Sequence, residues 1–214
     1  FNEGVEAFEK GDYKTALSIF EDLSSTNNSE AQYYLGFLYY NGQGVKQDYK
    51  KAIEWYEKAA AQGFADAQYN LGIMYASGQV VKQDYNKAKE WFEKAAAQDD
   101  TEAQYNLGFL YYNGEGVKQD YLKAKELYEK AATQGYAGAQ NNLGVMYANG
   151  YGVKQDYKKA IEWYEKAATQ GYAMAQYNLG FLYANGQGVK QDYFKAKEWY
   201  EKAAAKGHAD AQNN

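Results

Sequence analysis

The sequence predicts an all-α solenoid, a fold in which short helical units stack in a row. A period is the first observation, because one tyrosine recurs every 36 residues, at Tyr13, Tyr49, Tyr85, Tyr121, Tyr157 and Tyr193. An alanine and the pair Ala–Gln recur with the same period. Each period also holds two segments with apolar residues at helical spacing. A fixed period of this length is typical of proteins whose units bury their apolar faces only against their neighbours.

The period divides the chain into a leading segment, five whole units and a short tail. Residues 1–30 precede the repeats, and residues 211–214 start a further first helix. We expect the five units to span residues 31–66, 67–102, 103–138, 139–174 and 175–210.

The first half of each unit predicts a helix, as in the segment AQYNLGIMYASG that begins at Ala67. Ala67, Leu71, Met74 and Tyr75 fall on one helical face, with Gly72 among them. Glycine inside a helix costs about 1 kcal/mol relative to alanine. The recurrence of this glycine at positions 36, 72, 108, 144 and 180 therefore predicts a close approach by a neighbouring helix.

The second half of each unit predicts another helix, as in DYNKAKEWFEKAAAQ. Asp84 is the expected N-cap, because its carboxylate accepts a free backbone N–H and faces the positive helix end. The apolar face comprises Ala88, Trp91, Phe92 and Ala95. A glycine follows this helix at positions 63, 135, 171 and 207, where a left-handed closing residue is expected.

The segment NGQGVKQDY, at Asn41–Tyr49, joins the two helices and returns in variant form in every unit. Its paired glycines suggest a phosphate-binding loop. That motif needs a strand before the glycines and a third glycine, and both are missing. We interpret the segment as a helix–loop–helix joint in which Val45 covers the core and Asp48 starts the second helix.

Composition excludes several kinds of function. The net charge is −5, and all 23 basic residues are lysine, with no arginine and no cysteine. An acidic chain without arginine is a poor candidate for nucleic-acid binding. No apolar run approaches ~20 residues, so we expect no membrane insertion. No signal peptide is recognisable, so the sequence leaves periplasmic or secreted and cytoplasmic locations open.

The sequence contains no recognisable catalytic or cofactor set. His208 is the single histidine and has no partner for acid–base or metal chemistry. The carboxylates of the second helices form i,i+4 pairs with lysine, which we interpret as a solvated face. These pairs are Glu54–Lys58, Glu90–Lys94, Glu126–Lys130, Glu162–Lys166 and Glu198–Lys202. We therefore expect no enzymatic activity and no cofactor.

The first helices carry no charge over residues 31–41, 67–77, 103–113, 139–149 and 175–185. Spacing of i, i+4 and i+7 gives each of them a second stripe, away from the core face. The stripes comprise Tyr33, Phe37, Tyr40 and Asn41; Tyr69, Ile73, Ala76 and Ser77; Tyr105, Phe109, Tyr112 and Asn113; Asn141, Val145, Ala148 and Asn149; and Tyr177, Phe181, Ala184 and Asn185. Tyrosine is enriched at interfaces, although its simpler role here is to fill gaps between repeats.

The pattern AQYNLGFLY-NG-GVKQDY-KA-EWYEKAA-QG resembles the Sel-one-like repeat, a relative of the tetratricopeptide repeat, over nearly all of residues 31–210. Residues 1–30 resemble a tetratricopeptide hairpin and are expected to form the N-terminal cap. The resemblance implies a right-handed superhelix of antiparallel helix pairs, with the first helices lining a concave groove. It also implies that Asn70, Asn106, Asn142 and Asn178 flank the stripes and bond a ligand backbone.

Some positions depart from the repeat pattern. Val80 replaces the second loop glycine, Leu127 replaces a tryptophan, and Asn141 replaces a tyrosine of the stripe. Asp99 and Asp100 replace the pair of glycine and aromatic residue, and we expect this junction to be the least protected from hydrogen exchange.

These observations predict a monomeric, non-enzymatic scaffold that binds a protein or peptide in a neutral, aromatic groove. Three alternatives stay open. One is a glycan-binding module, since glycans also stack on aromatic rings. Another is a consensus or designed scaffold without a natural ligand, and the third is an enzyme acting on cell-wall or β-lactam substrates. The missing nucleophile and base argue against the enzyme.

Overall fold

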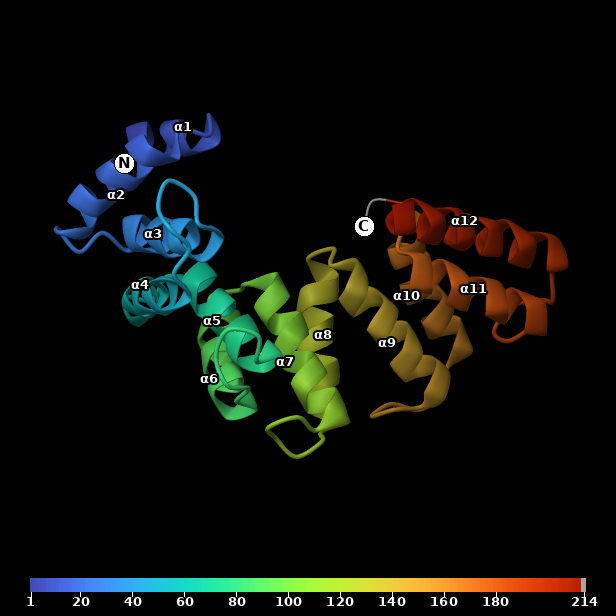
Figure 1. The fold of residues 1–214 in the computed structure, drawn as a ribbon. Helices are drawn as coiled ribbons and strands as arrows, with labels where there is room; N and C mark the ends of the chain where they lie inside the picture. The colour runs from blue at the N-terminus through green and yellow to red at the C-terminus, as the bar shows by residue number, and fades with distance from the viewer. Residues whose placement is uncertain (213–214) are drawn as a thin grey trace. The chain divides into compact units, whose positions relative to one another are not determined.

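The computed structural model describes residues 1–212, which form helices joined by short loops, with no strand among them (Figure 1). The helices are α1 (Asn2–Glu9), α2 (Tyr13–Ser24), α3 (Ser29–Asn41), α4 (Tyr49–Ala61), α5 (Ala65–Ser77), α6 (Tyr85–Ala96), α7 (Thr101–Asn113), α8 (Tyr121–Thr133), α9 (Ala137–Asn149), α10 (Tyr157–Thr169), α11 (Ala173–Asn185) and α12 (Tyr193–Gln212).

The helices belong to two compact units. Unit 1 spans Phe1–Ala103, and unit 2 begins at Gln104. In unit 1, α3 packs on α4 and α5 on α6, while α4 also packs on α5 of the next repeat. Unit 2 repeats this arrangement, with α9 packed on α10, α10 on α11 and α11 on α12. The all-α fold of paired helices with a 36-residue period is therefore confirmed.

The NGQG segment is a structural joint, as the sequence predicts. Gly42 ends α3 with a φ of 65°, in the left-handed region that favours glycine. Gln47 holds the loop closed, because its Nε2 donates to the carbonyl oxygen of Tyr40 at 2.9 Å. Val45 packs against the core of unit 1. Asp48 then caps α4 by accepting the backbone N–H of Lys51 at 3.1 Å.

The glycine inside each first helix permits a close helix contact, as predicted. A Cβ built on Gly72 would lie 2.5 Å from Cε1 of Phe92, whose side chain is 1% exposed. Glycines 36, 108 and 180 face the ring of Tyr56, Tyr128 and Tyr200 in the same way. An aromatic ring of the second helix therefore packs directly over this glycine.

A pair of hydrogen-bonded glutamines, which we call the glutamine clasp, links the start and the end of a repeat, and sequence reasoning did not identify it. Gln68 is 4% exposed at the start of α5, and its Nε2 donates to the carbonyl oxygen of Ala60 in the preceding repeat. Its Oε1 accepts from Gln98, after the second helix of its own repeat, at 2.9 Å. In the last repeat, Lys206 stands where this second glutamine belongs, and the buried Oε1 of Gln176 has no hydrogen-bond partner among the described residues.

The end of the described chain differs from the sequence prediction. Helix α12 runs through Gly207 to Gln212, so the turn expected at Gly207 and the new helix expected at residue 211 do not form there. The other repeats carry glutamine at the position that Lys206 occupies here. His208 lies outside the side chains that the structure describes.

The predicted pairing of Glu54 with Lys58 is wrong, because Lys58 Nζ lies 4.3 Å from the ring centroid of Trp55 instead. Lys94, Lys166 and Lys202 lie over Trp91, Trp163 and Trp199 in the same manner. The ion pairs that the structure records in the second helices are Lys89–Glu93, Lys125–Glu129 and Lys197–Glu201. On the charged face of the second helices, several lysines therefore contact tryptophan rings and not carboxylates.

Replacing Asp99 with glycine should stabilise the protein by about 1 kcal/mol, because Asp99 has a φ of 63° that disfavours a side chain. Chemical denaturation followed by circular dichroism measures the change. The reverse substitution, Gly135→Asp at a φ of 91°, is the matched control and should destabilise the protein. An Asp99→Gly variant no more stable than wild type would contradict this prediction.

Candidate partner-binding surface on the first helices

A hollow of about 260 Å³ lies in unit 1 between the first helices of two successive repeats. Side chains of α3, α4 and α5 line it, and none of them is charged. We call it the aromatic hollow; its residues are Phe37, Tyr40, Asn41, Tyr56, Tyr69, Asn70, Ile73 and Met74. Six of these eight were predicted from the sequence, all except Tyr56 and Met74.

Local packing fixes the walls of the aromatic hollow. Phe37 lies against Phe8 with ring centroids 5.5 Å apart, and Tyr40 lies against Tyr49 at 5.2 Å. The opposite face of α3 is buried, with Leu35 and Leu38 at zero exposure. These anchors hold the rings in place before any ligand arrives, which lowers the entropic cost of binding.

The asparagines expected to bond a ligand already interact with the preceding repeat. Burial raises the pKa of Tyr33, and a hydrogen bond with Asn70 partly offsets that effect. Burial likewise raises the pKa of Tyr56, again opposed by a hydrogen bond with Asn70. In unit 2, Asn142 bonds Tyr105 in the same way. These amides therefore lie close to tyrosine hydroxyls of the preceding repeat.

Asn141 does not lie on an accessible surface, which corrects the sequence prediction. Its side chain is 1% exposed, and its Oδ1 accepts from Nδ2 of Asn178 at 3.1 Å. The two predicted ligand-binding asparagines thus satisfy each other. An amide fits this place because the facing position also carries an amide, a pairing that the sequence of a single unit does not show.

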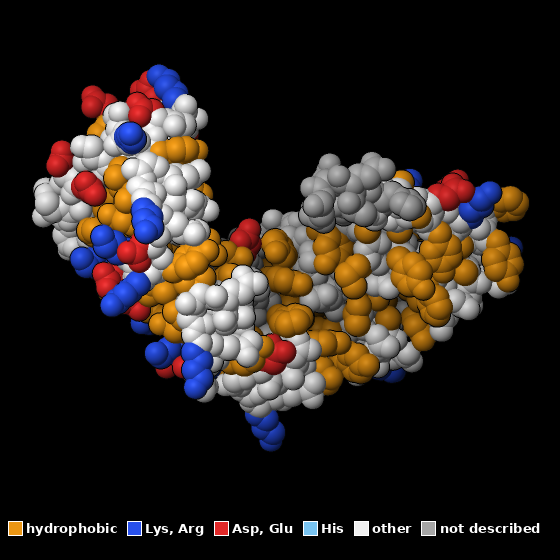
Figure 2. Space-filling view, in the orientation of Figure 1, with side chains coloured by type: hydrophobic (Ala, Val, Ile, Leu, Met, Phe, Trp, Pro, Cys, Tyr) orange, Lys and Arg blue, Asp and Glu red, His pale blue; other side chains and the backbone are white. Residues whose placement is uncertain are grey.

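The remaining predicted residues lie in unit 2, and their exposure varies. Phe109, Tyr177 and Phe181 are 42%, 56% and 47% exposed. Tyr105 and Tyr112 are half-buried, as is Asn106, while Asn113 is exposed. On the face drawn in Figure 2, hydrophobic side chains gather over α9 and α11 with few charges among them.

A second hollow, of about 460 Å³, adjoins the aromatic hollow in unit 1. We call it the acidic hollow; its residues are Tyr33, Asp66, Tyr69, Asn70, Asp100, Thr101 and Glu102. Tyr69 and Asn70 line both hollows. The carboxylates escaped the sequence analysis because Asp66 and Glu102 lie just before the charge-free stretches, although the loss of the aromatic residue at position 100 was a visible signal.

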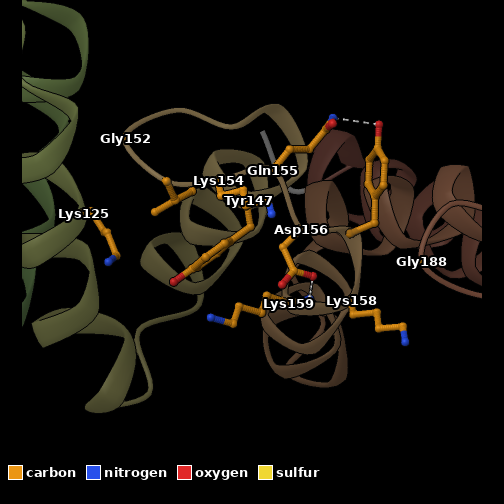
Figure 3. Close-up of a pocket in the computed structure, with 11 residues that line it drawn as sticks. Lys125, Tyr147, Gly152, Lys154, Gln155, Asp156, Lys158, Lys159 and Gly188 are labelled. Carbon is orange, nitrogen blue, oxygen red and sulfur yellow. Dashed lines mark hydrogen bonds between the residues drawn. The ribbon is translucent and has the colours of Figure 1, made fainter.

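A larger depression of about 750 Å³ lies in unit 2 at the loop between α9 and α10 (Figure 3). Its polar groups serve the joint itself. Asp156 accepts the backbone N–H of Lys159 at 3.1 Å, and Gln155 donates to the Tyr157 hydroxyl at 3.0 Å. Lys159 Nζ lies 5.4 Å from the ring centroid of Tyr147. We therefore assign this depression to the helix–loop–helix structure.

The described residues offer neither a metal site nor a membrane-spanning helix. No group of three or more histidine, cysteine, aspartate or glutamate side chains is placed to hold a metal ion. No described helix is both long enough and apolar enough to cross a membrane.

Comparison with known proteins identifies the repeat. The Sel1 repeat model matches residues 29–64, 65–100, 101–136, 137–172 and 173–208. No curated protein is recognisably similar to the chain.

Solved structures share the fold. A Sel1 repeat protein from Oxalobacter formigenes is 35% identical with a TM-score of 0.91, covering 96% of this chain and 82% of its own. The Escherichia coli protective antigen c5321 is 38% identical with a TM-score of 0.86. That match covers 89% of this chain but only 41% of c5321. A Klebsiella pneumoniae protein described as a Sel1 repeat protein is 27% identical with a TM-score of 0.56, covering 89% of this chain and 93% of its own.

These matches confirm the solenoid fold, and Sel1 repeat proteins commonly serve as scaffolds for interactions between proteins. The five matched repeats cover most of the sequence, and each of them contains the joint and the helix pair described above. The chain therefore belongs to the Sel1 repeat family.

Proposed function

We propose that this protein is a non-enzymatic scaffold that binds a segment of a partner protein on its first helices. The aromatic hollow carries the proposal, because five of its eight residues come from the uncharged stripes of two successive first helices and a sixth, Asn70, flanks them. Tyrosine and phenylalanine offer large, rigid contact areas, and the tyrosine hydroxyl and asparagine amide add polar contacts at the rim. The half-buried stripe residues of unit 2 extend the same chemistry.

The size of the aromatic hollow suits one apolar side chain of an extended segment. A fully buried aromatic side chain contributes roughly 1.5–3 kcal/mol. Two or three such contacts along the first helices would give micromolar binding after the costs of association. The proposal therefore needs contacts in more than one repeat.

Substituting Ile73 with lysine should reduce partner capture at least about tenfold, because a charged group then enters the aromatic hollow. The protein would be immobilised and incubated with lysate of its source organism, and captured proteins quantified by mass spectrometry. Ala61→Lys, at an exposed position in α4 outside the stripes, is the control and should leave capture unchanged. We expect both variants to fold, because the aliphatic part of a lysine side chain can extend along apolar surface. Circular dichroism checks this.

Equal capture by wild type and Ile73→Lys would contradict the proposal. A glycan array run on the same proteins tests the alternative ligand class. Binding of soluble glycans that Ile73→Lys abolishes, with no captured protein, would replace the protein partner by a glycan.

A further inference from the structure

The junction after α6 differs from two other described junctions in the residue that faces the stripe tyrosine. Phe64 covers Tyr33 with ring centroids 5.2 Å apart, and in unit 2 Tyr136 covers Tyr105 at 4.9 Å. Tyr69 is the counterpart of these tyrosines, and the position that would supply its cover holds Asp100. The substitution replaces an aromatic ring with a carboxylate and leaves the acidic hollow beside Tyr69.

The carboxylates of the acidic hollow lie near one another. Partial burial, together with repulsion from Asp100, raises the pKa of Asp66. No ion pair that the structure records joins Asp66 or Asp100 to a lysine of the described chain. The hollow therefore concentrates negative charge in a protein region whose adjoining surface is uncharged.

Local structure explains only part of this charge. Asp100 caps α7 by accepting the backbone N–H of Ala103 at 2.8 Å. Asp66 lies in the first turn of α5, where a negative charge favours the helix dipole. Yet α9 and α11 form with Gly138 and Met174 at the equivalent position, so a carboxylate there is not required for a first helix.

The two hollows are neighbours, because Tyr69 and Asn70 contribute to the lining of both. A segment lying across Tyr69 would place one side chain among uncharged rings and a neighbouring side chain among carboxylates. A lysine or arginine suits the second place, where it meets opposite charge and an aromatic ring. This protein already places lysine over tyrosine, as with Lys87 Nζ at 5.2 Å from the Tyr75 ring centroid.

We propose that unit 1 recognises an extended segment of a partner protein that carries an apolar side chain followed or preceded closely by lysine or arginine. The apolar side chain occupies the aromatic hollow, and the basic side chain occupies the acidic hollow. This inference rests on the proposed function and adds the chemistry of the partner to it. The charge complementarity selects a basic segment and disfavours an acidic one.

A random peptide library displayed on phage tests the inference, with the full chain as bait. Wild type would be compared with three variants. Asp66→Asn combined with Glu102→Gln neutralises two carboxylates of the acidic hollow. D99G combined with D100Y introduces a Gly–Tyr pair, which should place an aromatic ring over Tyr69. The chain itself carries this pair at residues 135–136 and 171–172. Ile73→Lys blocks the aromatic hollow.

Wild type should enrich peptides in which lysine or arginine lies within about four residues of an aromatic or large aliphatic residue. Both variants of the acidic hollow should keep the apolar preference and lose the basic one. A selected peptide should bind them about tenfold more weakly than it binds wild type, by fluorescence polarisation. Its analogue with glutamine in place of the basic residue should bind wild type and both variants with similar affinity.

The outcomes separate the two proposals. Enrichment of apolar peptides without basic residues would overturn this inference and leave the proposed function standing. If D99G/D100Y binds the basic peptide as tightly as wild type does, this inference is likewise overturned and the proposed function stands. Peptides that bind Ile73→Lys as well as wild type, or no enrichment at all, would overturn both.

Discussion

Raising the pH from about 9 to about 11 is expected to lower the free energy of unfolding by about 4 kcal/mol. Tyr56, Tyr128 and Tyr164 lie in α4, α8 and α10, and none of their side chains is more than 4% exposed. Burial raises the pKa of all three hydroxyls well above the ordinary value of 10.0.

The sign of the effect follows from proton binding. Above about pH 10 the unfolded chain releases these protons, while the folded chain retains them. The stability is fully present below that pH and decreases by about 1.4 kcal/mol for each buried tyrosine at about pH 11. Guanidinium unfolding at a series of pH values, followed by circular dichroism, measures the loss.

A triple tyrosine-to-phenylalanine variant at positions 56, 128 and 164 is the control. Phe92 occupies the equivalent place in α6 and is 1% exposed, so a phenylalanine ring fits this position. The variant should lose far less stability over the same pH range. If wild type and variant lose the same amount, the buried hydroxyls are not responsible.

Substituting Gly72 with valine is expected to lower the free energy of unfolding by about 3 kcal/mol. A Cβ at this position would lie 2.5 and 2.6 Å from two ring atoms of Phe92, which is buried and has no room to move aside. The two helices would have to separate, and the contacts on either side of them would loosen. Chemical denaturation measures the change.

A second substitution tests the cause of that loss. Phe92→Leu, added to Gly72→Val, removes the ring that the valine meets and should recover at least about half of the lost stability. Ala61→Val, at an exposed position in α4, isolates the helix propensity of valine and should cost about 0.5 kcal/mol or less. An equal loss of stability in Gly72→Val and Ala61→Val would mean that the contact with Phe92 does not cause the loss.

The sequence predicts the features whose cause is local. An aspartate directly before a helical pattern predicts an N-cap, and Asp48 caps α4 as expected. A glycine that recurs inside a helix indicates a close contact, and Gly72 meets Phe92. The uncharged stripes on the first helices predicted five residues of the aromatic hollow for the same reason, since helical spacing alone determines which side chains share a face.

The predictions that were wrong depend on neighbouring residues that the rule ignores. The i,i+4 rule pairs Glu54 with Lys58, yet Lys58 lies over Trp55, three residues before it. Stripe spacing places Asn141 at the surface, yet Asn178 of the next repeat bonds and covers it. Each case is decided by a competing contact, which becomes visible only once the neighbouring side chains have positions.

The glutamine clasp has a consequence for how such a chain changes during evolution. Gln68 bonds one partner inside its own repeat, Gln98, and otherwise takes only a backbone carbonyl from the repeat before it. A main-chain acceptor exists whatever the neighbouring side chain is. Repeats are therefore interchangeable at this polar contact, and whole copies can be duplicated, deleted or reordered in the gene without leaving a buried amide unsatisfied. The junction that contains Asp99 and Asp100 then distinguishes one place along the array from its neighbours.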